Sequence, residues 1–312
     1  MRKSTISYLF LICLIFISYN SSQASTYYLT FSGWSNAQTS SNWNTNQDGT
    51  GTSATSFTNS GDIFIVPSNL TGIINGNWTI GSGVTLEIQG NLNIEKNSNS
   101  SFTINGVIIF PSSAYALAGP NTGNSKSSFV LSSGATLKTA NPKGILGIDC
   151  SIEVDKFSVT LNSEATYEFN GTSAQTTLGL PAQINNLVVN NSYGITLSDS
   201  VTISGAITMT SGLLSTGTKK IYFSGTASNP TETSGSRIVG TAVMTGRSIG
   251  TASLNFLNVY LHSGNDLGTV TITRVTGSAV TIGSYSGIKS YWNITTTNTT
   301  ATRNVDYSWW SV

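Results

Sequence analysis

The apolar residues between Asn186 and Phe223 come in pairs at a nearly constant step, and three consecutive steps from Ile195 to Leu213 are six residues each. Within each pair, apolar positions alternate with Ser or Thr, which is typical of a half-buried strand. Ser-Asp, Ser-Gly or Thr-Ser-Gly between the pairs is turn chemistry. Short strands joined by corners at a constant step predict an all-β fold, a right-handed parallel β-helix.

If about three pairs complete one turn of the coil, neighbouring pairs lie on successive sides of it. The outward residues Thr202/Ser204 and Thr208/Thr210 would then not share a face, which argues against a flat threonine array in this stretch. The same step recurs between Ile73 and Phe110. We therefore predict a β-helix shaft over residues 73–235, interrupted at 111–127, where Pro and Gly residues indicate a projecting loop.

The two ends of the chain show other patterns. Residues 25–72 carry Trp34 and Trp43, a polar loop and an apolar strand led by Asp62. We expect this segment to be an N-terminal aromatic cap, because the first coil of a solenoid exposes its core and strand edges. Residues 236–312 have longer alternating strands, and Tyr291 to Ile294 is typical of the tryptophan strand of a β-sandwich. The chain stops inside a strand, so we expect an incomplete sandwich-like module, compatible with a fragment of a longer protein.

The first residues predict export. Arg2 and Lys3 precede an apolar run from Tyr8 to Ile17, and Ser22-Gln23-Ala24 has the small-x-small form of a cleavage site. This pattern predicts a signal peptide over 1–24, removed to give a secreted or cell-surface protein of a Gram-negative type. The run is short of the ~20 residues that span a bilayer, so we expect no transmembrane span after cleavage.

Charge and cysteine content exclude some classes. The chain has 14 Lys+Arg and 13 Asp+Glu; without Arg2 and Lys3, the mature chain is near −1. The basic residues form no patch, so nucleic-acid binding is not expected, and no oligomer is implied. After processing only Cys150 remains, so no intrachain disulfide forms, and we predict a buried apolar role for this thiol.

Two stretches resemble large secreted surface proteins of the Bacteroidetes type. The first is Asn42-Trp43, the polar loop and the Asp-led strand that ends at Pro67. The second, 167–217, contains Asn170-Gly171-Thr172-Ser173-Ala174-Gln175, then Asn185-Asn186-Leu187-Val188-Val189-Asn190-Asn191-Ser192, followed by the repeated pairs. The resemblance implies a repetitive, adhesin-like extracellular shaft. The C-terminal sorting domain expected for such proteins is not visible.

An acidic stretch is the main candidate for catalysis. If 148–154 is one strand, Asp149, Glu153 and Asp155 lie on the face opposite Ile148, Cys150 and Ile152. Glu153 and Asp155 would have Cα atoms roughly 6.6 Å apart, a spacing compatible with glycoside hydrolysis or with a shared Ca²⁺. Parallel β-helices elsewhere carry polysaccharide lyases and hydrolases on their outer faces. A solvated acidic face beside Lys156 is the simpler alternative.

Two further groups of residues could bind a metal or take part in catalysis. Asn44, Asn46 and Asp48 place oxygen atoms at alternate positions before Gly49, a partial match to a calcium loop that ordinary turn chemistry also explains. His262, the single histidine, has Asp266 nearby, but a lone histidine at a strand end is commonly a solvated surface residue. A histidine and a cysteine alone do not make a standard zinc site. No cofactor is expected other than Ca²⁺.

We therefore expect a non-enzymatic, exported surface protein that serves adhesion or display, with a glycan or cell-surface ligand as its partner. The alternative is a polysaccharide-binding or polysaccharide-degrading β-helix that uses the Asp149/Glu153/Asp155 face and the 111–127 loop.

Overall fold

The computed structural model describes residues 23–30, 36–95, 99–111, 116–119, 126–153, 157–277, 281–282, 285–286 and 289–308. Regular structure in these residues is strand throughout, apart from a single 3-10 turn at Ser40–Asn42. Most strand pairs are parallel. The all-β, mainly parallel architecture predicted from the apolar pairs is confirmed. None of these residues belongs to a helix long and apolar enough to cross a membrane.

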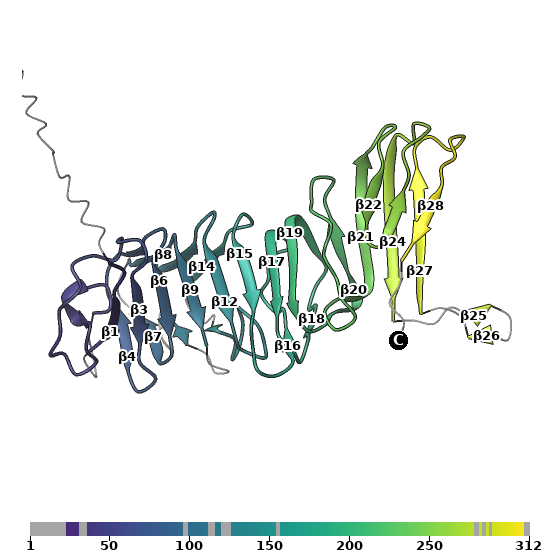
Figure 1. Ribbon diagram of the computed structural model, residues 1–312. Coiled ribbons are helices and arrows are strands. Elements are labelled where there is room, and N and C mark those ends of the chain that lie inside the picture. The colour runs from purple at the N-terminus through teal and green to yellow at the C-terminus, as the bar shows by residue number, and fades with distance from the viewer. Residues whose placement is uncertain are drawn as a thin grey trace, which may run out of the picture.

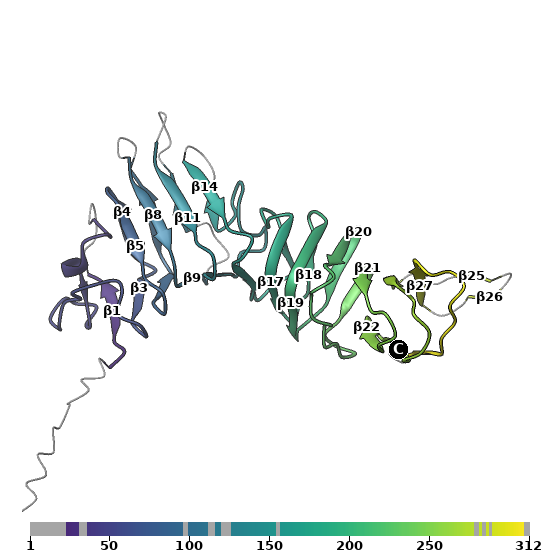
Figure 2. The same cartoon turned by 90° about the horizontal axis from the view of Figure 1, so that it is seen from above.

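Three parallel sheets run along the long axis of the molecule, and the strands of each sheet follow one another along that axis (Figures 1 and 2). Every strand of the first coils pairs in parallel with the strand three further along the chain. The strands of the first sheet are β3 (Ile63–Val66), β6 (Thr85–Ile88), β9 (Val107–Phe110) and β12 (Thr136–Thr139); those of the second are β4 (Thr71–Ile74), β7 (Asn91–Ile94), β10 (Leu117–Ala118) and β13 (Ile152–Glu153); those of the third are β5 (Trp78–Ile80), β8 (Ser101–Ile104), β11 (Ser128–Leu131) and β14 (Ser158–Leu161).

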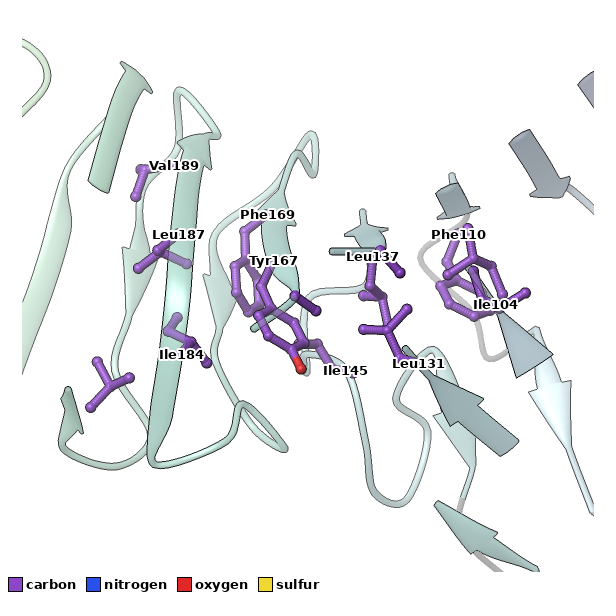
Figure 3. Packing of buried hydrophobic residues seen from close by; sticks show 14 of the residues in the cluster. Ile104, Phe110, Leu131, Leu137, Ile145, Tyr167, Phe169, Ile184, Leu187 and Val189 are labelled. Atoms are coloured by element: carbon purple, nitrogen blue, oxygen red, sulfur yellow. The ribbon is translucent and has the colours of Figure 1, made fainter. Parts of the chain in front are cut away.

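The core lies between these sheets because alternate residues of each strand point inward. Inward positions in register form columns of buried side chains, which Figure 3 shows for Leu137, Tyr167 and Leu187. In the third sheet the column is aromatic: the Trp78 and Phe102 rings stack with centroids 4.8 Å apart, and Phe129 follows at 5.4 Å. Stacked aromatic pairs stabilise beyond their buried area.

The first sheet continues through the later coils with β15 (Thr166–Phe169), β17 (Gln183–Asn190), β19 (Val201–Ser211), β20 (Leu214–Phe223) and β21 (Ile238–Ser248), and β16 (Gln175–Thr176) and β18 (Ile195–Thr196) lie beside them. The prediction that Thr202/Ser204 and Thr208/Thr210 lie on successive sides is wrong, because β19 contains both pairs. The Ser-Gly between them does not make a corner. The register shift opposite, between Ile184 and Asn186, marks an irregularity of the bulge type within a continuous strand.

A buried polar column supports one corner of these coils. The Gln175 side chain donates to the carbonyls of Thr139 and Asn141, both at 3.0 Å. Its Oε1 accepts from Gly171 N at 2.7 Å and from Asn191 Nδ2 at 2.8 Å. Gln175 is 2% exposed and Asn141 and Asn191 are fully buried. Gln175 Oε1 thus satisfies the buried N–H of Gly171. Its amide nitrogen adds a second donor to two carbonyls that already accept from Asn170 N and Gly144 N.

The N-terminal end of the core is covered by residues 25–30 and 36–60. β1 (Thr26–Leu29) pairs in parallel with β3 and antiparallel with β2 (Trp43–Asn44). Trp43 is fully buried, its Nε1 donates to Ala37 O at 2.8 Å, and its ring contacts Phe57, Phe64 and Trp78. Ala37 N bonds to Ile73 O in the second sheet, and Phe57 O accepts from Gly81 N beside the third. Each sheet therefore has a partner at this end. Trp34 lies outside the described residues.

At the other end the pairing changes from parallel to antiparallel. β21 pairs in parallel with β20 but antiparallel with β24 (Thr269–Thr276), which pairs antiparallel with β27 (Ser290–Thr296). A second antiparallel sheet, here called the terminal sheet, contains β22 (Leu254–Phe256), β23 (Val259–Leu261) and β28 (Val305–Tyr307). A short pair, β25 (Thr281–Ile282) and β26 (Tyr285–Ser286), completes the strands. The Trp292 and Tyr307 rings, 5.4 Å apart, join the terminal sheet to β27.

A buried ion pair holds the loop before β21 to the sheet. The Arg274 and Glu232 side chains are 3% and 1% exposed, and both Arg274 Nη atoms donate to the Glu232 carboxylate. Arg274 Nη1 also donates to Asn258 Oδ1 at 3.1 Å. Asn258 and Leu257 form the two-residue turn between β22 and β23, and both have positive φ, as a type I′ hairpin requires. Arg274 therefore links the first sheet, the Glu232 loop and the terminal sheet.

Candidate functional site

The acidic stretch does not form the predicted strand. Ile148 is 77% exposed and Asp149 has a φ of 58°, so the chain turns here, and strand β13 begins only at Ile152. The turn lies in the short loop between Leu146 and Ile152, which form a parallel bridge. The prediction that Asp149 shares a strand face with Glu153 is therefore wrong. Asp155 lies outside the described residues.

The side chain of Asp149 pairs with Lys143 instead, with Lys143 Nζ 2.5 Å from Asp149 Oδ2. This hydrogen bond raises the pKa of Lys143. Both side chains are more than half exposed, so the pair is a surface ion pair. Cys150 beside it is fully buried, as predicted, and burial raises the pKa of its thiol; a thiol of this kind is a poor nucleophile.

The residues of the candidate calcium loop bond to one another. Asn44 Oδ1 accepts from Asn46 N at 3.0 Å, and Asp48 Oδ1 accepts from the N and the Oγ1 of Thr50 at 3.0 and 2.7 Å. The two bonds from Thr50 lower the pKa of Asp48. The bonds from Asn46 N and Thr50 N are the backbone to side-chain bonds of Asx turns. The geometry therefore supports the turn interpretation of Asn44, Asn46 and Asp48, which stood beside the calcium interpretation. Within the described ranges, no three His, Cys, Asp or Glu side chains gather as metal ligands would.

The predicted loop at 111–127 is in part a strand. Leu117 is fully buried in β10, which joins β7 to β13 in the second sheet. The strand contains only two residues between Pro- and Gly-rich segments, so the sequence has no alternation long enough to reveal it. The projecting loop is therefore wrong for Leu117 and Ala118. Residues 112–115 and 120–125 lie outside the described part of the chain.

His262 lies in a cluster on the outer face of the terminal sheet. Its Nε2 is 2.8 Å from Asp306 Oδ2, and its ring meets that of Tyr260 edge-on, with centroids 4.7 Å apart and planes at 77°. The predicted neighbour Asp266 does not take this role, since its Oδ1 accepts from Gly268 N at 2.7 Å. Strand pairing explains the choice, because β28 brings Asp306 directly opposite Tyr260.

Asn255, Tyr260 and Asp306 form one row across the three strands of the terminal sheet, in register. We call these residues and His262 the terminal face. Tyr260 is 38% exposed, while its strand neighbours Val259 and Leu261 are buried. The row therefore points to solvent, opposite the packed side of the sheet.

The loops behind the terminal face are fixed by Arg303. Its guanidinium donates to the carbonyl oxygens of Ala252, His262 and Asn265 at 2.5, 3.0 and 2.7 Å, and also to that of Gly250. The face thus combines an exposed aromatic ring, an imidazole and a carboxylate on a sheet whose loops are held in place. An aromatic surface bordered by acceptors and donors is suited to a polyhydroxylated ligand.

The sequence signals only part of this face. Alternation in Val259-Tyr260-Leu261 indicates that Tyr260 points away from the core. Asp306, 44 residues from His262, has no local signal, because its place depends on antiparallel pairing between distant strands.

Comparisons of this chain with family models, with curated proteins and with solved structures find no match.

Proposed function

We propose that this chain is a non-enzymatic, exported surface protein in which a right-handed parallel β-helix shaft, with an N-terminal aromatic cap, carries a sandwich-like module for adhesion or display. The supporting observation is that three parallel sheets run along an elongated body, and a separate antiparallel sheet lies at one end (Figure 1). The right hand is expected, because nearly all crossovers between parallel strands have that hand. The exposed location rests on the signal-peptide pattern of residues 1–24.

This arrangement suits display because the shaft supplies length and stiffness, while the module carries the exposed terminal face. The columns of buried side chains and the edge-to-edge ladders stiffen the coils over the whole length. The terminal face lies on the antiparallel end, away from the end covered by Trp43, where a ligand on another surface can approach it.

The test is the location of the protein in the producing cell. Fractionation followed by protease treatment of intact cells should find the protein in the surface or secreted fraction and accessible to the protease. Protein that stays in the cytoplasm would contradict the proposal.

A second candidate function, glycan binding, is favoured by the terminal face rather than by the acidic stretch. Glycan-array binding of the purified chain should weaken about tenfold or more with Tyr260→Ala, a loss of about 1.4 kcal/mol of stacking and contact energy. Tyr193→Ala is the matched control, since Tyr193 is 68% exposed and lies on a turn of the shaft. Equal binding by both variants would remove the terminal face from consideration.

A further inference from the structure

Asp62 is a buried carboxylate at the N-terminal end of the shaft. It is 2% exposed. Its Oδ1 accepts from the backbone N–H of Ser25 at 2.9 Å, and its Oδ2, also buried, has no hydrogen-bond partner among the described residues. None of the ion pairs formed within the described ranges includes Asp62. Burying a carboxylate is costly unless a positive charge and enough donors compensate it.

A neutral side chain would serve the observed contact equally well. An asparagine Oδ1 accepts one amide N–H as an aspartate Oδ1 does, without the cost of a buried charge. The carboxylate is favourable only if a cation comes to the same place. The group already held there is the nitrogen of Ser25.

The position of that nitrogen is set by strand pairing. Ser25 O accepts from Ile63 N at 2.9 Å, and the next residue, Thr26, begins β1 opposite Ile63. Gln23 and Ala24, in contrast, are exposed. The chain therefore becomes exposed immediately before Ser25, at the bond that the small-x-small pattern marks for cleavage.

We propose that cleavage after Ala24 turns the Ser25 nitrogen into an α-ammonium that forms an ion pair with Asp62. An endopeptidase of the export route hydrolyses the amide with one water molecule. The C–N bond breaks, the Ala24 carbonyl carbon gains the oxygen of water and becomes a carboxylate, and the Ser25 nitrogen gains both protons of water. The ammonium has three N–H donors where the peptide has one, so it has a donor for Oδ2 as well as for Oδ1.

As a consequence, the segment that begins at Ser25 is held more tightly to the shaft after processing. In the precursor, β1 is held to β3 by its ladder, and the Ser25 N–H before it donates one hydrogen bond to Asp62. In the processed chain, a charge-assisted contact of the stronger kind is added at the first residue. The inference rests on the proposed export for the cleavage itself, whereas the ion pair can be tested on purified protein.

The experiment compares four purified chains: chains that begin at Ser25 or at Ala24, each with Asp62 or with Asp62→Asn. A removable N-terminal fusion that leaves no extra residue produces them. The readout is the rate at which a small amine-reactive ester acylates the α-amine of the native protein near neutral pH, followed by mass spectrometry. The chain that begins at Ser25 with Asp62 should react about tenfold more slowly than the other three, the effect of a one-unit rise in the pKa of the amine.

Two further measurements test whether the slower acylation comes from the folded structure and the ion pair. In denaturant all four rates should become similar, which shows that the protection comes from the fold. The thermal midpoint should be about 2–4 °C higher for the Ser25 chain than for the Ala24 chain with Asp62, and equal for the two Asp62→Asn chains. The Ala24 chain keeps every side chain of the shaft, so it separates loss of the ion pair from loss of folding.

Equal acylation rates of the native Ser25 and Ala24 chains would overturn the ion pair. A processed protein from producing cells whose first residue is not Ser25 would overturn the cleavage. Neither result depends on where the protein is found. A surface-exposed protein whose Ser25 α-amine reacts at the unprotected rate would therefore contradict this inference and remain consistent with the proposed function.

Discussion

The shaft and the C-terminal module hold their parts together by different interactions. In the shaft, the inner face of the third sheet carries one continuous column of aromatic rings from Trp78, Phe102 and Phe129. In the module, the link between two sheets and a loop passes through the buried Arg274–Glu232 pair. Parallel coils repeat, so equivalent positions stack and apolar side chains fill most of the core between them. Where the strand direction reverses, the repeat ends, and one long side chain with several directed donors joins segments that do not stack.

Because the shaft depends on its apolar columns, we expect its stability to be most sensitive to loss of core volume. Phe102→Ala should lower the free energy of unfolding by about 3–5 kcal/mol, because it leaves a cavity between two aromatic rings. Chemical denaturation followed by tryptophan fluorescence measures it. Thr79→Ala, on the exposed face of the same sheet, is the control, and a similar loss in both variants would contradict the aromatic column as the source of stability.

The module should be most sensitive to removal of one charge. Arg274→Met should destabilise it by about 3 kcal/mol, because Glu232 would remain buried without its partner. The double variant Arg274→Met with Glu232→Leu should recover much of the loss, since both buried charges are then gone. Hydrogen exchange should place the effect of the single variant in β24 and the terminal sheet, with the coils before β15 unchanged. Uniform loss of protection along the chain would count against separate modes of stabilisation.

The corner amides should give an intermediate effect. Gln175→Ala removes the acceptor of Gly171 N and one donor to each of two buried carbonyls. It should cost about 1–3 kcal/mol, chiefly because the buried Gly171 N–H is left without a partner. Gln183→Ala, at an exposed position of β17, is the matched control in the same denaturation experiment. A loss no larger than that of the control would mean that water replaces Gln175 at this corner.

The smallest effect is expected for the surface ion pair. Lys143→Ala should leave the unfolding midpoint unchanged within error, because Lys143 and Asp149 are both more than half exposed and water screens such pairs. A measurable drop would show that the turn at Ile148 and Asp149 depends on this contact.

Sequence alone determined the class of fold, because alternation of apolar and polar residues depends only on which face of a strand is buried. It also indicated the buried role of Cys150. It gave no role to Gln175 and Asn191, whose buried hydrogen bonds only the structure shows. The resemblance itself and the export signal stay predictions.

Only the tertiary structure decided which residues meet. The first part of the strand expected at 148–154 is a turn, and the strand begins only at Ile152. β10 replaces part of an expected loop, and β19 runs through an expected corner. The partners of His262 and Asp62 lie 44 and 37 residues away. Local periodicity carries no information about such contacts, because they depend on the register and direction in which distant strands pair.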